Sequence, residues 1–295
     1  MIVRNWCRAI FSTKPSLHTS LLYPYLPIYN KPALLAATIP PINNSIHSLA
    51  DKRLITISSG GFLGFYMSGV CKYIKKHYQL DNVVFSGASA GSWISLILTY
   101  KGDPDDIYGM LLSSNVFGAT SISHVEELIK ECLLTHYSTE DFELDRLYIG
   151  VTIFKNWGFE NVVYSNFDSL TDAINCCIAS SHIPFVTGGA SYTYRNALSF
   201  DGGFSKYPYL KTITPTFHIT PEIWNKNKTD AWKLDNFTTL FSRDKYDFIK
   251  NLDAGYHDTL ENKHIIDLLF TIKNKDGDSG VATKPNHQTP FEYNW

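Results

Sequence analysis

The sequence predicts an α/β fold, a three-layer α/β/α sandwich around a central, mostly parallel sheet. From Leu54 onward, apolar runs short enough for buried strands alternate with longer stretches of helical spacing. Glycine-rich turns join the first two strands to the helices that follow them, at residues 58–64 and 87–91. A chain of 295 residues with 44% hydrophobic content can bury such a sheet.

Charge and composition divide the chain into three parts. Residues 1–50 carry four basic groups and no acidic group, so this extension has a net charge of +4. Its residues 2–14 show helical spacing of apolar and basic side chains, which is typical of a mitochondrial transit peptide, whereas its prolines favour a disordered extension. We expect the main domain in residues 51–215 and a helical extension packed on it in residues 216–295.

Each element of these parts follows from a local pattern. The apolar runs 54–58 and 82–86 predict strands, and the glycine-rich turns start helices at 62–78 and 89–100. The other expected elements are a short helix ending at Leu112, helices at 121–134 and 170–181, strands at 147–154, 161–164 and 192–200, a turn at 156–158, and helices at 240–252 and 259–270.

The first chemical motif is G-A-S-A-G at residues 87–91, directly after a buried strand. Gly87 and Gly91, with the small Ala88 and Ala90, let the chain turn sharply from strand to helix. This turn presents the Ser89 hydroxyl at a helix N-terminus, where developing negative charge is stabilised. Ser89 is therefore a candidate nucleophile.

The second motif is S-S-G-G-F-L-G at residues 58–64, between the first strand and its helix. The backbone N–H groups of Gly60 and Gly61 suit the oxyanion of an acyl-transfer intermediate. A dinucleotide-binding loop is the rival interpretation. It fits less well, because Ser59 replaces the first glycine and Asp81 lies before the second strand rather than at its end.

The third motif is F-D-G-G-F at residues 200–204. Asp201, at a strand end and followed by Gly202 and Gly203, could approach Ser89 and serve as its general base, although Asp-Gly is also a plain turn signal. An ordinary α/β-hydrolase would instead have a Ser-Asp-His triad. Four histidines that follow Asp201 could complete such a triad: His218, His257, His264 and His287.

In this order and spacing, the three motifs resemble the patatin-like phospholipase family over residues 51–215. The stretch 60–70 is most similar to the branch that includes adipose triglyceride lipase, and A-S-S-H-I-P-F at 179–185 resembles the segment before the family's catalytic Asp. Ser59 stands where that lipase branch has glycine. The resemblance implies a patatin-like catalytic domain with Ser89 as nucleophile, Asp201 as base, oxyanion donors Gly60, Gly61 and Ala90, and motif glycines Gly64, Gly87, Gly91, Gly202 and Gly203.

The resemblance implies a lipid acyl hydrolase of phospholipase A or lipase type that works through an acyl-enzyme without a cofactor or metal. Its substrate would be a phospholipid or acylglycerol at a membrane or lipid-droplet surface, which Trp224 or Trp232 could contact. A net charge of −2 without a basic stripe argues against nucleic acid, and five irregularly spaced cysteines favour an intracellular, reducing compartment, cytoplasmic or mitochondrial. A catalytically weak lipid-binding homologue is the non-enzymatic alternative.

Overall fold

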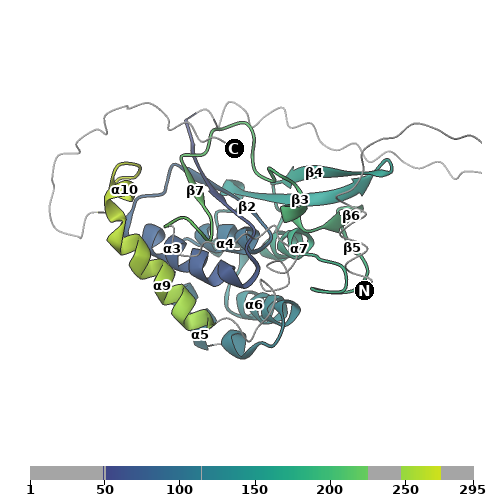
Figure 1. The fold of residues 1–295 in the computed structure, drawn as a ribbon, viewed down its shortest axis with the longest axis horizontal. Coiled ribbons are helices and arrows are strands. Elements are labelled where there is room, and N and C mark those ends of the chain that lie inside the picture. Colours follow the sequence, from purple (N-terminus) through teal and green to yellow (C-terminus); the bar gives the residue numbers. More distant parts are fainter. Residues whose placement is uncertain (1–48, 50, 114, 225–246, 274–295) are drawn as a thin grey trace, which may run out of the picture. The chain divides into compact units, whose positions relative to one another are not determined.

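The computed structural model describes residues 49, 51–113, 115–224 and 247–273 (Figure 1). The expected helix at residues 2–14, Trp232 and His287 lie outside the described residues. The strands are β1 (Arg53–Ile57), β2 (Val83–Ala88), β3 (Leu147–Lys155), β4 (Gly158–Tyr164), β5 (Tyr192–Tyr194), β6 (Ala197–Phe200) and β7 (Phe217–Ile219). The α-helices are α3 (Gly64–His77), α4 (Ala90–Leu98), α5 (Pro104–Ser113), α6 (Ile122–His136), α7 (Leu170–Ser180), α9 (Phe248–Glu261) and α10 (Lys263–Asp267).

The described strands form one mixed, mostly parallel sheet flanked by helices, which confirms the predicted α/β class (Figure 1). The strands β7, β1, β2 and β3 lie side by side and parallel, and β4, β6 and β5 add antiparallel pairs at the β3 end. Because the central strands are parallel, their carboxyl ends lie along the same edge of the sheet. The glycine-rich turns after β1 and β2 therefore meet at that edge.

The strand β3 pairs with both β2 and β6 and so brings the ends of these two strands close together. One side of β3 pairs with β4, whereas the other side pairs first with β2 and then with β6. The strand β2 ends with Ala88 opposite Gly150, and β6 ends with Phe200 opposite Thr152. Two strands that run in opposite directions thus end almost face to face, and the residues that follow them are neighbours in space.

One face of the sheet carries the main hydrophobic core. Alternate side chains of β1, β2 and β3 point to this face, as expected for strands with a period of two, and pack against α3, α4 and α7. Helices α5 and α6 extend the same core outward. In the described part of the chain, the opposite face contacts Leu49, Leu210 and Ile213.

The expected single strand at residues 192–200 is wrong. It is a hairpin, β5 and β6, with a two-residue turn at Arg195 and Asn196, whose φ angles are 44° and 63°. Two consecutive left-handed residues make the primed turn that matches the twist of paired strands. Asn at the second position tolerates this conformation, but Arg-Asn lacks the glycine that marks such turns in a sequence.

The segment after residue 215 also differs from the expectation of two helices at 240–252 and 259–270. It adds the strand β7 to the sheet beside β1, and α9 runs without a break through Gly255. A side chain at Gly255 would overlap the carbonyl oxygen of Tyr66, and one at Gly69 would overlap that of Leu252. These glycines let α3 and α9 cross in close contact, which compensates for the weak helix propensity of glycine. Residues 240–246 lie outside the described part.

None of the helices in the described ranges combines the length and apolar character that crossing a bilayer requires.

Candidate active site

Ser89 lies in a strained turn between β2 and α4. Its φ and ψ angles are 54° and −127°, a conformation that non-glycine residues rarely adopt. Side chains at the two motif glycines would not fit, because one at Gly87 would overlap the carbonyl of Gly91, and one at Gly91 would overlap the carbonyl of Ile57. The small residues on either side thus allow a tight turn that directs the serine hydroxyl away from the helix.

The Ser89 hydroxyl contacts the Asp201 carboxylate directly. The Oγ atom of Ser89 donates to Oδ2 of Asp201 at 2.6 Å, and Oδ1 of Asp201 accepts from the Gly203 N–H at 2.6 Å. Both side chains are buried, with 5% of Ser89 and 4% of Asp201 exposed. Burial raises the pKa of Asp201 from 3.8 to about 6, against the opposing effect of these two hydrogen bonds. Near neutral pH the carboxylate is therefore mostly ionised and can accept a proton.

Residues 180–182, at the end of α7, hold the two halves of the site together. The Ser89 N–H donates to Ser180 Oγ at 2.8 Å, and Ser180 Oγ donates to the Gly150 carbonyl at 2.7 Å. The Asp201 N–H donates to the His182 carbonyl at 2.8 Å. Ser89 and Asp201 are thus fixed by adjacent residues of one segment. No motif in the sequence predicted a role for Ser180. The available signal for this residue was the resemblance of residues 179–185 to a family segment.

The glycine loop lies beside Ser89. Gly61 has a φ of 52° and lines the same pocket as Ser89 and Ala90, whereas Gly60 lies behind it, against the Met67 side chain. A β-carbon on Gly64 would lie 2.9 Å from that of Ala90, so the N-terminal turns of α3 and α4 touch. The Gly64 N–H at the start of α3 bonds to the Gly61 carbonyl, so the candidate donors near Ser89 are the N–H groups of the glycine loop before it and the first amides of α4.

Ser59 is accommodated by the Asp-Gly-Gly loop. A β-carbon on Gly203 would lie 2.5 Å from Ser59 Oγ, so the serine side chain occupies the space that a side chain at residue 203 would need. The neighbouring Ser58 hydroxyl donates to the Ser59 carbonyl at 3.0 Å. The departure from glycine at residue 59 is therefore matched by glycine at residue 203.

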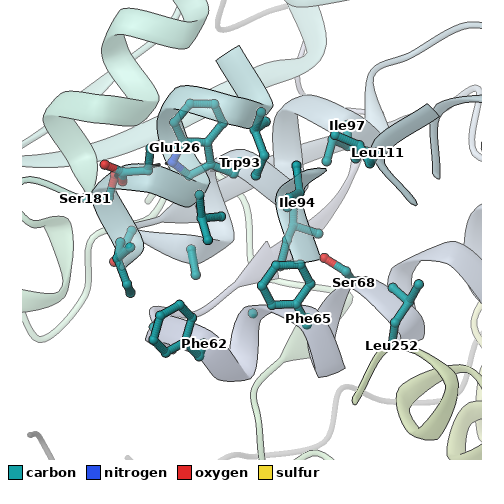
Figure 2. A pocket seen from close by; sticks show the side chains of 18 of the residues that line it. Phe62, Phe65, Ser68, Trp93, Ile94, Ile97, Leu111, Glu126, Ser181 and Leu252 are labelled. Atoms are coloured by element: carbon teal, nitrogen blue, oxygen red, sulfur yellow. Dashed lines mark hydrogen bonds between the residues drawn. The ribbon is translucent and has the colours of Figure 1, made fainter. Parts of the chain in front are cut away.

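An apolar pocket opens beside Ser89 between α3, α4, α5 and α6 (Figure 2). The cavity has a volume of about 90 Å³, below the range of about 300–1,000 Å³ that is usual for ligand pockets. Its walls are mainly aliphatic and aromatic, including Phe62, Phe65, Ile94, Leu111 and Leu252. Such a surface suits a hydrocarbon chain.

A buried polar group, Glu126, interrupts this wall. Figure 2 shows it together with Ser181 and Trp93. The Ser181 hydroxyl donates to Glu126 Oε1, with the Cys177 carbonyl as a second acceptor at 2.8 Å, and it accepts from Trp93 Nε1 at 3.3 Å. Burial raises the pKa of Glu126 to about 8, against the opposing effect of the hydrogen bond from Ser181, so at pH 7 the pocket remains mostly uncharged.

The histidines that could complete a triad lie on other elements. His218 is on β7, with Nδ1 2.7 Å from Thr56 Oγ1, and burial lowers its pKa to about 4. His257 packs against Tyr256 on α9, and His264 lies on α10. The His182 ring packs against Phe200 and Tyr192. In the described ranges, no group of three or more His, Cys, Asp or Glu side chains is placed to hold a metal ion.

The chain is similar to known lipid-processing proteins. Residues 55–210 match the model of a family described as patatin-like phospholipase. Human patatin-like phospholipase domain-containing protein 4 is 27% identical over 187 residues, 57% of this chain and 70% of that protein. Human 1-acylglycerol-3-phosphate O-acyltransferase PNPLA3 is 26% identical over a match that covers 57% of this chain and 37% of that protein. Human omega-hydroxyceramide transacylase is 25% identical over a match that covers 51% of this chain and 30% of that protein. The matched region is thus about a third of each of the latter two proteins.

Proposed function

This chain belongs to the patatin-like phospholipase family, and from that premise we propose that it hydrolyses fatty acyl esters of lipids through a Ser89–Asp201 dyad and an acyl-enzyme. The observation that carries the proposal is the 2.6 Å hydrogen bond from Ser89 Oγ to Asp201 Oδ2 at the edge of an apolar pocket. A nucleophile next to its base, with an apolar surface beside it for an acyl chain, is what cleavage of a lipid ester requires.

In the first half of the reaction, Asp201 takes the Ser89 proton as Oγ attacks the ester carbonyl carbon. The negative charge that forms on the carbonyl oxygen would be held by N–H groups of Gly60, Gly61 and Ala90 at the two helix N-termini. When the tetrahedral intermediate collapses, the bond to the alcohol breaks, and Asp201 returns the proton to the leaving oxygen. The acyl group remains on Ser89.

In the second half, water attacks the acyl-enzyme and gives its proton to Asp201. Collapse of the second intermediate releases the fatty acid and returns the proton to Ser89. Asp201, with a pKa raised to about 6 by burial, is a base matched to this two-way transfer near neutral pH. The neutral pocket wall at Glu126 would accept the acyl chain without leaving a charge unpaired.

Hydrolysis of a lipid panel tests this proposal. Phosphatidylcholine, galactolipid, monoacylglycerol and triacylglycerol, offered separately to the wild type and to Ser89→Ala, should show release of fatty acid by the wild type only. Release by both proteins would refute Ser89 as the nucleophile. Release by neither from any of the four lipids would favour the lipid-binding alternative.

Acyl transfer is a second candidate, because the names of two of the relatives describe acyl transfer. An acceptor alcohol such as lysophosphatidic acid or a monoacylglycerol would then compete with water for the same intermediate. A labelled acyl chain that appears on the added acceptor rather than as free acid would favour transfer.

A further inference from the structure

The β3–β4 hairpin carries an exposed cluster of three aromatic side chains. Phe154, Trp157 and Phe159 are 37%, 92% and 46% exposed. Their rings contact one another edge to face, with centroids 6.5 Å apart for Phe154 and Trp157 and 5.3 Å apart for Phe154 and Phe159. We name these three residues the aromatic tip. Large apolar side chains gathered on a protrusion usually mark an interaction surface.

The turn of this hairpin holds Trp157 in an unfavourable conformation. Asn156 and Trp157 have φ angles of 50° and 63°, which belong to a primed two-residue turn that Asn-Gly fits best. Left-handed geometry disfavours a bulky side chain such as tryptophan. Since 92% of Trp157 is exposed, its packing within the chain offsets little of this cost. A contact outside the chain would account for an indole at this position.

The aromatic tip projects from the edge of the sheet that holds the site. The strand β2 ends at Ala88, opposite Gly150, whereas β3 continues for five more residues to Lys155. At about 3.3 Å per residue, the hairpin extends about 16 Å beyond the end of β2. In Figure 1 the hairpin lies next to β6, which pairs with β3 as far as Phe154.

Aromatic contacts also link the tip to the site. Phe159 packs on Phe200, the residue before Asp201, with centroids 5.4 Å apart. A further exposed aromatic residue, Phe185, is 65% exposed on the loop that lines the pocket through Thr187. Trp224, by contrast, packs on Phe217 and donates to Thr259 Oγ1 at 3.1 Å, so it is engaged within the fold.

We propose that the aromatic tip, together with Phe185, docks the protein on the surface of a phospholipid bilayer; this rests on the proposed function, since a lipid ester must reach Ser89 from such a surface. Aromatic rings partition into the interface between headgroups and acyl chains. The charged residues of the hairpin near the tip, Lys155 and Glu160, are of opposite sign. Docking through this surface therefore depends on aromatic partition rather than on anionic lipid, and it is insensitive to salt.

The experiment compares the full-length wild type with Trp157→Gly on phosphatidylcholine vesicles, by co-sedimentation at low and high salt. Glycine is the best residue for this turn position, so the variant loses the indole without a cost to folding. The control is Leu268→Ala, which removes a side chain that is 76% exposed near α10, at the opposite end of the ribbon (Figure 1). A short-chain water-soluble ester measures the dyad independently of docking.

We expect Trp157→Gly to bind vesicles about tenfold more weakly at both salt concentrations, because it loses the burial of one large aromatic side chain. Leu268→Ala should bind as the wild type does, and all three proteins should cleave the soluble ester equally. Unchanged vesicle binding by Trp157→Gly would overturn the docking surface. If the wild type fails to cleave any ester while the binding difference persists, the proposed function fails and the docking surface stands.

Discussion

Replacing Asp201 by Asn should inactivate the protein and stabilise its fold. The Asp201 carboxylate is buried, and its pKa is raised from 3.8 to about 6. Such a difference between the unfolded and folded states corresponds to about 3 kcal/mol, at about 1.4 kcal/mol per pKa unit. Asn keeps an oxygen that can accept from the Gly203 N–H, and it is neutral at every pH.

The sign of the effect follows from the raised pKa. Below about pH 4 the carboxyl group is neutral in both states, and the two proteins should be equally stable. Between about pH 4 and pH 6 the unfolded chain ionises while the buried group keeps its proton, so the wild type loses stability. Above pH 6 the loss levels off, and Asp201→Asn should be more stable by about 3 kcal/mol.

The assays are urea unfolding at pH 4, 6 and 8 and hydrolysis of a water-soluble ester. Loss of a general base should lower kcat by about 100- to 10,000-fold, and wild-type kcat/KM should rise with an apparent pKa near 6. The matched control is Asp258→Asn, which changes a buried Asp that accepts from the Tyr66 hydroxyl at 2.8 Å. This control should lose stability and keep its ester activity. A less stable Asp201→Asn at pH 8, or an active one, would refute the reasoning.

Three further predictions follow from contacts around the dyad. Ser180→Ala removes the acceptor of the Ser89 N–H and should lower kcat about tenfold with little change in KM, because a lost buried hydrogen bond costs about 1–3 kcal/mol; an unchanged kcat would contradict it. Gly203→Ala brings a β-carbon within 2.5 Å of Ser59 Oγ and 2.8 Å of Asp201 Oδ1 and should lower ester turnover, and added Ser59→Gly should recover part of the loss by removing the first contact; two additive losses would contradict the pairing. Glu126→Gln should match wild-type stability near pH 4 and exceed it by a few kcal/mol at pH 9 in urea unfolding, because burial raises the pKa of Glu126 to about 8 and stability is lost as pH rises towards that value; equal curves would contradict a neutral Glu126.

The parts of the fold that the sequence predicted are those set by local chemistry. Alternation of apolar runs and helical spacing placed β1, α3, β2 and α4 within a few residues, because each is bounded by a glycine-rich turn. The errors arose where distant contacts decide. The helix α9 continues through Gly255 because Tyr66 on α3 packs against that glycine. The strand β7 forms because it can pair with the edge of β1. Neither partner is visible in the local pattern.

The residues of the candidate site also fall into those predicted from a local motif and those whose role depends on distant contacts. Ser89 and Asp201 were predicted from motifs, because a strained turn and a strand end need particular residues at particular positions. Their approach to 2.6 Å depends on β3, which pairs with both strands that lead to them. Ser180 and Glu126 belong to helices whose local pattern is ordinary. Their importance comes from what they meet in space, which helical spacing does not reveal; for Ser180 the available signal was the resemblance of residues 179–185 to a family segment.

The most direct test of the central claim is active-site labelling with a fluorophosphonate, followed by peptide mapping. The account predicts one label on Ser89 in the wild type, none in Ser89→Ala and a much slower reaction in Asp201→Asn. It also predicts wild-type labelling when His218, His257, His264 and His287 are each replaced by Ala. Loss of labelling in any one of these histidine variants, or a label on another residue of the wild type, would contradict a Ser89–Asp201 dyad.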